Sequence, residues 1–262
     1  MKKLYFGAAL LFIGLTSCSS SDDSNNNTPS SFLPLTATSA WVYDVHLNTE
    51  NIGRDSLYVN GSTTINGSTY QKLNTKSTPT GFYTSTLNNN SVRKDGDKLV
   101  LSGSSGFGLA EILPVSINLS DFIIFKENGS NNAELAAVSG TLEQDVQGLP
   151  LKIDYKLKSI FKESLSSFTV PGKETYNNVK VIKIVVNLKI GTVYLLPVIN
   201  TPVPIAILNA QDVIVSTHYY AEGVGMIYSK TNVEYQLQDF SQAGLDLPIP
   251  QQGSSIIEEF LD

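Results

Sequence analysis

The sequence has few of the residues that build disulfide, metal and nucleophilic sites. Its 262 residues include one cysteine and two histidines. A single cysteine cannot form an intrachain disulfide framework, and no CxxC or HExxH motif provides the local spacing of a zinc site. The nucleophile motif GxSxG is also missing, since GSSGFG at 103–108 has the wrong order. The sequence therefore predicts no catalytic constellation, no metal and no cofactor.

Charged residues are scarce as well, at 16% against a usual value of about 25%. The 18 basic and 24 acidic side chains give a net charge of −6, and lysine and arginine form no run. Proteins that bind nucleic acid normally carry a clustered basic surface. We therefore expect no nucleic-acid partner.

The longest apolar run lies at the N-terminus, where residues 4–15 follow Lys2 and Lys3. A membrane-spanning helix needs roughly 20 apolar residues, so this run is too short to cross a bilayer. A cationic start followed by a short apolar core is typical of a signal peptide. We predict that residues 1–17 are a secretory leader.

The cysteine directly follows this leader, in the sequence Leu15, Thr16, Ser17, Cys18. These four residues resemble the bacterial lipobox, and the resemblance implies cleavage before Cys18 and a lipid on its thiol. A free thiol in an ordinary leader is the alternative. The serine- and acid-rich residues 19–24 are similar to the export signal of Bacteroidota surface lipoproteins, with a plain polar linker as the alternative.

These resemblances imply an outer-membrane lipoprotein, anchored by its acyl chains and facing outward from the cell. Residues 18–31 are too polar to fold by themselves, so we expect them to form a flexible tether. Residues 32–262 are then expected to form a single domain.

The period of the apolar residues in 32–262 predicts strands. Apolar and polar residues alternate along 41–47 and 149–162, and lysines dominate the polar side of the second segment. Residues 179–190 are apolar on both sides, which indicates a central strand. The dipeptides at Asn66 and Asp95, each followed by glycine, predict hairpin turns, and Gly61 predicts a bulge. The closing SSIIEEFLD predicts a short C-terminal helix.

We therefore predict an all-β domain of ten to fourteen antiparallel strands with at most that one short helix. The stretch YYAEGVGMIYS at 219–229 resembles the closing strands of envelope lipoproteins, in which a large curved antiparallel sheet forms a half-barrel around an apolar ligand. That resemblance implies a half-barrel, and a β-sandwich is the alternative.

Residues 192–208 are almost uncharged and contain three prolines. They form either an edge hairpin packed on its own core or an apolar lip over a ligand cavity, with Leu195 and Ile205 as candidate contacts. His218 and Tyr220 are either part of a sugar-stacking surface or part of the core. Glu222 precedes a glycine, where the backbone can approach a ligand.

These observations favour a non-catalytic binding module for an apolar or glycan ligand. The first alternative is a structural or accessory subunit that docks on another envelope protein. A glycan hydrolase is the second, and it would need two acids facing each other across a cleft. No spacing selects such a pair from the scattered candidates, which are Asp121, Glu127, Asp154, Glu222 and Asp239.

Overall fold

The computed structural model describes residues 31–106, 116–146, 148–196, 201–239 and 250–262, without the side chains of 194–196 and 201. The predicted leader, Cys18 and most of the predicted tether lie outside these residues. Ser31–Asp262 form one compact unit. Its elements are β1 (Ala40–Leu47), β2 (Glu50–Ile65), β3 (Ser68–Thr75), α1 (Phe82–Leu87), β4 (Asn90–Asp95), β5 (Lys98–Ser105), β6 (Ile117–Lys126), β7 (Ala133–Val146), β8 (Leu149–Thr169), β9 (Thr175–Leu196), β10 (Thr201–Ala221), β11 (Gly225–Gln236) and β12 (Gln252–Leu261).

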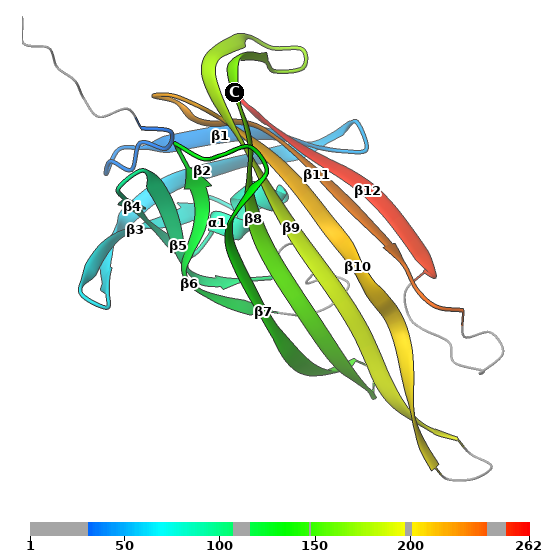
Figure 1. Cartoon of the computed structure of the whole chain (residues 1–262). Coiled ribbons are helices and arrows are strands. Elements are labelled where there is room, and N and C mark those ends of the chain that lie inside the picture. Colours follow the sequence, from blue (N-terminus) through cyan, green and yellow to red (C-terminus); the bar gives the residue numbers. More distant parts are fainter. Residues whose placement is uncertain (1–30, 107–115, 147, 197–200, 240–249) are drawn as a thin grey trace, which may run out of the picture. The chain divides into compact units, whose positions relative to one another are not determined.

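The twelve strands of the described residues belong to one antiparallel sheet, in the order β6-β5-β4-β3-β2-β1-β12-β11-β10-β9-β8-β7. Neighbours in sequence pair with each other, and β1 pairs with β12. The first and last strands therefore meet in the middle of the sheet, and its edges are β6 and β7. The sheet curls until it nearly closes into a barrel, and we call this shape the half-barrel (Figure 1). The predicted all-β class, the number of strands and the half-barrel are confirmed.

Bulges and tight turns lie where the sequence predicts them. Gly61, with φ of +76°, lies in a register shift between Val59 and Ser62 where β2 pairs with β3. A bulge bends a strand and increases its twist, which helps a sheet to curl. The predicted hairpin turns join β2 to β3 at Asn66 and β4 to β5 at Gly96.

The C-terminal helix is the part of the secondary-structure prediction that is wrong. Residues 252–261 form β12, which pairs with β1 on one side and β11 on the other. The ladder with β11 covers residues 252–260 and the ladder with β1 covers 257–261, and together they outweigh the local preference of this segment for helix. Glu258 and Glu259 alternate in direction, and Glu259 points into the half-barrel, where it is fully buried.

The inside of the half-barrel is filled by α1 and by the inward side chains of the strands. The helix contacts β2, β3, β4, β5 and β12, and its residues Phe82, Tyr83 and Leu87 are buried. At one end of the unit Phe32 is buried and stacks on Phe125, with ring centroids 5.1 Å apart. The backbone carbonyl of Ser31 accepts a hydrogen bond of 2.8 Å from the amide of Gly223.

A second cluster lies on the outer face, where the end of the β8–β9 hairpin folds over β10, β11 and β12. Phe168 stacks on Tyr219 with ring centroids 4.0 Å apart, and Tyr228 packs on Phe260 with ring centroids 5.1 Å apart. The other buried members of this outer cluster are Val170, Val179, Ala221 and Ile227.

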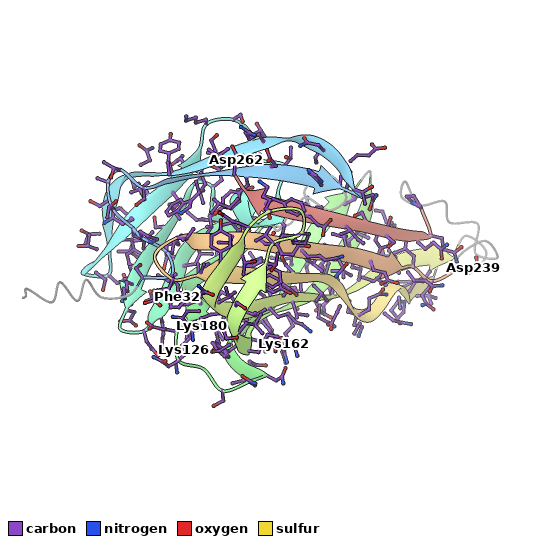
Figure 2. The ribbon with its side chains drawn as sticks, turned by 90° about the horizontal axis from the view of Figure 1, so that it is seen from above. Phe32, Lys126, Lys162, Lys180, Asp239 and Asp262 are labelled. Atoms are coloured by element: carbon purple, nitrogen blue, oxygen red, sulfur yellow. The ribbon has the colours of Figure 1, made fainter. Side chains whose placement is uncertain are left out.

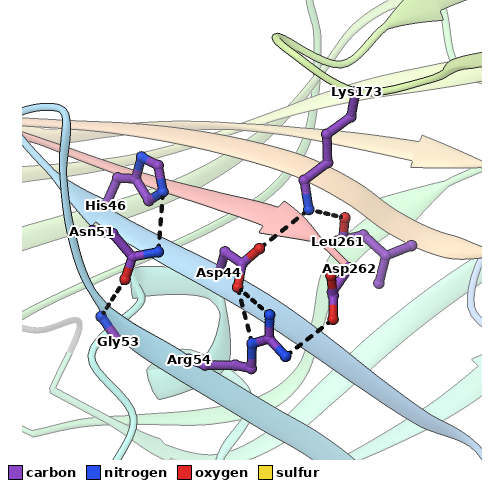
Figure 3. A network of polar contacts seen from close by, with 8 residues as sticks. All are labelled: Asp44, His46, Asn51, Gly53, Arg54, Lys173, Leu261 and Asp262. Atoms are coloured by element: carbon purple, nitrogen blue, oxygen red, sulfur yellow. Dashed lines mark hydrogen bonds and ion pairs between the residues drawn. The ribbon is translucent and has the colours of Figure 1, made fainter.

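A polar network fixes this hairpin end to β1 and β12 (Figure 3). Lys173 donates to the carbonyl of Leu261 at 2.8 Å and pairs with Asp44 at 3.3 Å. Arg54 forms ion pairs with Asp44 at 2.9 Å and with Asp262 at 3.2 Å. Burial alone would raise the pKa of Asp44, but hydrogen bonds from Arg54 and Lys173 outweigh it and lower that pKa.

The three longest strands are β8, β9 and β10, with 21, 22 and 21 residues. They run beyond the half of the sheet that holds α1, as Figure 1 shows. We call the part of β7–β10 that lies beyond α1 the blade. It includes residues 140–146 and 149–155 of the β7–β8 hairpin, with 188–196 and 201–208 of the β9–β10 hairpin.

Candidate functional site: a groove on the blade

The blade carries a groove with a volume of about 810 Å³. This volume lies in the range of pockets that hold small molecules, about 300–1,000 Å³. The groove is lined by Glu143, Gln144, Asp145, Pro150, Leu151, Lys152, Asp154, Lys189, Ile190, Gly191, Thr192, Val193, Pro204, Ile205 and Ala206.

Two small residues on adjacent strands leave this hollow. The strand register places Lys152 on β8, Gly191 on β9 and Ala206 on β10 side by side. A Cβ atom at Gly191 would lie 3.2 Å from the carbonyl oxygen of Ile205, a close contact, so a side chain there would crowd the backbone of β10. Gly191 and Ala206, paired across the two strands, therefore add little bulk to the groove lining.

One wall of the groove is apolar. Val193 has 55% of its surface exposed, the largest fraction among the large hydrophobic side chains in the described part of the chain. It pairs with Pro204, which is also exposed, and the next pair is Thr192 with Ile205. Exposed apolar area of this kind is typical of contact surfaces.

The other wall is charged, with both signs present. Glu143 lies opposite Lys152 in the β7–β8 pair, and Asp154 lies opposite Lys189 in the β8–β9 pair. The Thr141 hydroxyl donates to Asp154 at 2.6 Å. Such a groove offers an apolar surface beside groups that can donate and accept hydrogen bonds.

The structure does not bring the five predicted contacts together. Ile205 lines the groove. Leu195 lies in β9 with its backbone paired to Pro202, and its side chain is outside the described residues. His218 and Tyr220 lie further along β10, in the core beside α1, with 4% and 1% of their surface exposed.

His218 is a satisfied core residue, so it forms no sugar-stacking surface. Its Nε2 lies 2.8 Å from the Ser216 hydroxyl oxygen. Its ring packs edge-on against Tyr83, with ring centroids 5.3 Å apart. Burial lowers the pKa of His218 to about 3. Burial also raises the pKa of Tyr220.

Glu222 lies at the opposite end of β10 from Ile205, in the turn before β11. It is exposed, and its carboxylate accepts a hydrogen bond from the Asn178 amide. It therefore belongs to the end of the unit where Ser31 lies and not to the groove.

The half-barrel resemblance implied a ligand inside the curved sheet, but the described residues leave little room there. The interior cavity beside α1 has a volume of about 20 Å³ and is lined by Phe82, Tyr83, His218, Tyr220 and neighbouring apolar side chains. A cavity of this size holds about one water molecule. The helix occupies the place that the resemblance assigned to a ligand.

Two buried acids escaped the sequence analysis. Glu259 accepts hydrogen bonds from the backbone amides of Tyr83 and Thr84 at 2.8 and 3.0 Å. Asp55 accepts a hydrogen bond of 2.8 Å from the backbone amide of Gly81. The hydroxyl of Thr84 lies within 3.0 Å of both carboxylates. Burial raises the pKa of Glu259, although the hydrogen bonds to its carboxylate act in the opposite direction.

The carboxylates of these two acids accept hydrogen bonds from the backbone at the start of α1, so their oxygen atoms are already engaged. Asp55 and Glu259 expose 2% and 0% of their surface, so neither is open to a substrate. Gly81 belongs to the same arrangement, because a Cβ there would lie 2.1 Å from a carboxylate oxygen of Glu259. The two acids are far apart in sequence, and only the strand pairing brings them together. No local pattern marks them.

No group of three His, Cys, Asp or Glu side chains that could hold a metal ion occurs among the described residues. No helix in the same ranges is long and apolar enough to cross a membrane. No protein-family model, curated protein or solved structure matches the chain.

Proposed function

We propose that this chain is an outer-membrane lipoprotein, acylated at Cys18 and facing outward, whose β domain binds an apolar or glycan ligand without catalysis. The observation that carries the binding proposal is the groove on the blade, with its exposed apolar wall beside a charged one. The leader and the lipobox-like residues before Cys18 support the anchor.

The position of the groove suits an anchored binding protein. The chain enters the unit at Ser31, which bonds the turn after β10. Ile205 lies near the other end of β10, and at about 3.3 Å per residue the two points are on the order of 50 Å apart. Binding in the groove would therefore take place far from Ser31, the residue at which the chain enters the unit.

Substitutions in the groove test the binding proposal. In Val193→Glu a charge replaces the exposed apolar side chain, and in Ala206→Trp the hollow is filled. We expect both variants to bind an apolar fluorescent probe, anilinonaphthalene sulfonate, at least tenfold more weakly than the parent protein. Ile52→Glu is the matched control, because Ile52 is 42% exposed on β2, outside the groove lining. Equal probe binding by all four proteins would exclude the groove as the site.

The same variants distinguish the two ligand classes. If the ligand is a glycan, soluble oligosaccharides should compete with the probe for the parent protein and lose affinity for Ala206→Trp. If the ligand is apolar, fatty acids should compete instead.

The anchor has its own test. Mass spectrometry of the chain purified from its native membrane should find an N-terminal cysteine that carries acyl groups. An unmodified thiol at position 18, or a leader still attached, would contradict the lipoprotein assignment.

Docking on another envelope protein is the second candidate, and one observation favours it. The strand β7 is an edge of the sheet, and its residues 143–145 line the groove, so an extended partner segment could bind both. Crosslinking in intact cells should then capture a partner through the parent protein and not through Val193→Glu.

A further inference from the structure

Lysines gather at the end of the unit where the chain enters. Lys126, Lys162 and Lys180 lie near Phe32, on the side away from Asp239 (Figure 2). The Nζ atom of Lys180 lies 5.8 Å from the centre of the Phe32 ring. Phe32 also stacks on Phe125, the residue before Lys126.

A fourth lysine joins them through the strand register. Lys98 lies directly opposite Lys126 in the β5–β6 pair. Like charges that face each other across two strands are destabilising. An arrangement that stability alone disfavours points to a role for these charges outside the unit.

No acid of the described residues forms an ion pair with these four lysines. Lys162 donates to the amide oxygen of Asn132 at 3.2 Å, and Lys180 contacts the Ser164 hydroxyl at 3.3 Å. All four side chains are partly exposed. Their positive charges are therefore available to an external anion.

We propose that this lysine surface, made of Lys98, Lys126, Lys162 and Lys180, docks on the anionic headgroups of the membrane that holds the protein. The proposal rests on the acyl anchor at Cys18. Twelve residues separate Cys18 from Ser31, and a flexible chain of that length spans about 20 Å on average and about 45 Å when extended. The tether therefore brings this end of the unit to the bilayer, and the lysines supply the complementary charge.

Docking at this end orients the whole unit. The groove lies at the other end of the long strands, so the lysine surface would hold it away from the bilayer. A tether alone would leave the unit free to rotate.

Acids at the same end oppose this attraction. Asp97 precedes Lys98, Glu127 follows Lys126, and Glu222 lies beside Gly223, the partner of Ser31. Glu222 is exposed, so removal of its charge in Glu222→Gln should strengthen binding to an anionic surface.

The test uses the chain from residue 18 onward with Cys18→Ser, since the compact unit with its own core begins at Ser31. The cosedimentation of this variant is measured at low ionic strength with two kinds of vesicle. The neutral vesicles contain phosphatidylcholine alone, and the anionic vesicles also contain phosphatidylglycerol. A lysine near an anionic surface contributes roughly fivefold to binding. The triple variant Lys98→Gln, Lys126→Gln and Lys162→Gln should therefore lose on the order of a hundredfold in partitioning to the anionic vesicles. Glu222→Gln should gain a few-fold.

The matched control is Lys72→Gln, Lys76→Gln and Lys156→Gln, which removes the same charge from exposed positions outside both the lysine surface and the groove lining and should keep most of the binding. Equal losses in the two triple variants, or equal binding to both kinds of vesicle, would overturn the proposal. Because the Cys18→Ser variant carries no lipid, its binding to vesicles does not depend on the acyl anchor. Mass spectrometry tests the anchor separately.

Discussion

The two ends of the half-barrel treat the same alternating strands differently. Around α1 the inward side chains are covered by a helix, and buried acids fix that helix by its backbone amides. On the blade the inward side chains of Leu151, Ile153 and Ile190 are buried too, whereas Val193, on the outward side of β9, stays 55% exposed. An alternating pattern therefore sets which side of a strand faces the core, and an apolar side chain on the other side is left exposed unless another segment covers it. The predictions below compare the helix-filled end with more open parts of the unit.

The largest effect is expected from the acid that holds α1. Glu259→Ala would leave the amides of Tyr83 and Thr84 and the hydroxyl of Ser229 without their acceptor inside the core. Each unsatisfied buried donor costs about 1–3 kcal/mol, so we expect a loss of about 3–5 kcal/mol in the free energy of unfolding. Urea denaturation measures it. Glu234→Ala, at an exposed position on β11, is the control and should lose less than about 0.5 kcal/mol.

The second prediction concerns pH and the core histidine. Burial lowers the pKa of His218 from 6.5 to about 3, so between these values the unfolded chain binds a proton that the folded protein does not. Stability should therefore fall as the pH falls through this window, by about 1.4 kcal/mol per pH unit from this residue alone. Urea midpoints at pH 7, 6, 5 and 4 should drop more steeply for the parent than for His218→Gln. Parallel curves would contradict the burial of a neutral histidine.

A smaller effect is expected at the polar network on the outer face. Asp44→Asn weakens the contacts with Arg54 and Lys173, which are partly exposed and screened by solvent, so we expect a loss of about 1 kcal/mol. Because the pKa of Asp44 is lowered, this contribution is present above its ordinary pKa of 3.8 and disappears as the pH falls below it. Added salt should narrow the difference between parent and variant. A loss that ignores both salt and pH would mean that packing, and not charge, holds the hairpin.

The smallest effect on stability is expected on the blade. Val193→Glu changes an exposed side chain and should shift the free energy of unfolding by no more than about 0.5 kcal/mol, while weakening probe binding. Thermal denaturation checks the first statement and the probe titration the second. A loss of several kcal/mol would show that Val193 is part of a core and that the two ends do not differ.

Local patterns predicted much of the sheet. Alternation along 149–162 and 179–190 predicted β8 and β9, and the glycines at 61, 67 and 96 predicted a bulge and two turns. The helix α1 escaped because six residues are too short to show a helical period. The C-terminal segment was misassigned because its helical signals are local, whereas both of its strand partners are distant in sequence.

The candidate site was predicted only in part. The uncharged stretch 192–208 pointed to the groove, and Ile205 does line it. His218 and Tyr220 were predicted as part of a sugar-stacking surface or of the core, and they lie in the core because the strand that carries Ile205 extends over 21 residues from the blade to α1. Position along a long strand, and not membership of it, decides what a side chain contacts.

By itself the sequence determined the all-β class and the direction in which most strand residues point, because these depend on neighbours within a few residues. The tertiary structure alone decided that the first and last strands pair, that Asp55 and Glu259 meet at α1, and that Gly191 and Ala206 lie side by side. Those contacts join residues that are distant in the chain, and they arise only when the strands pair in register.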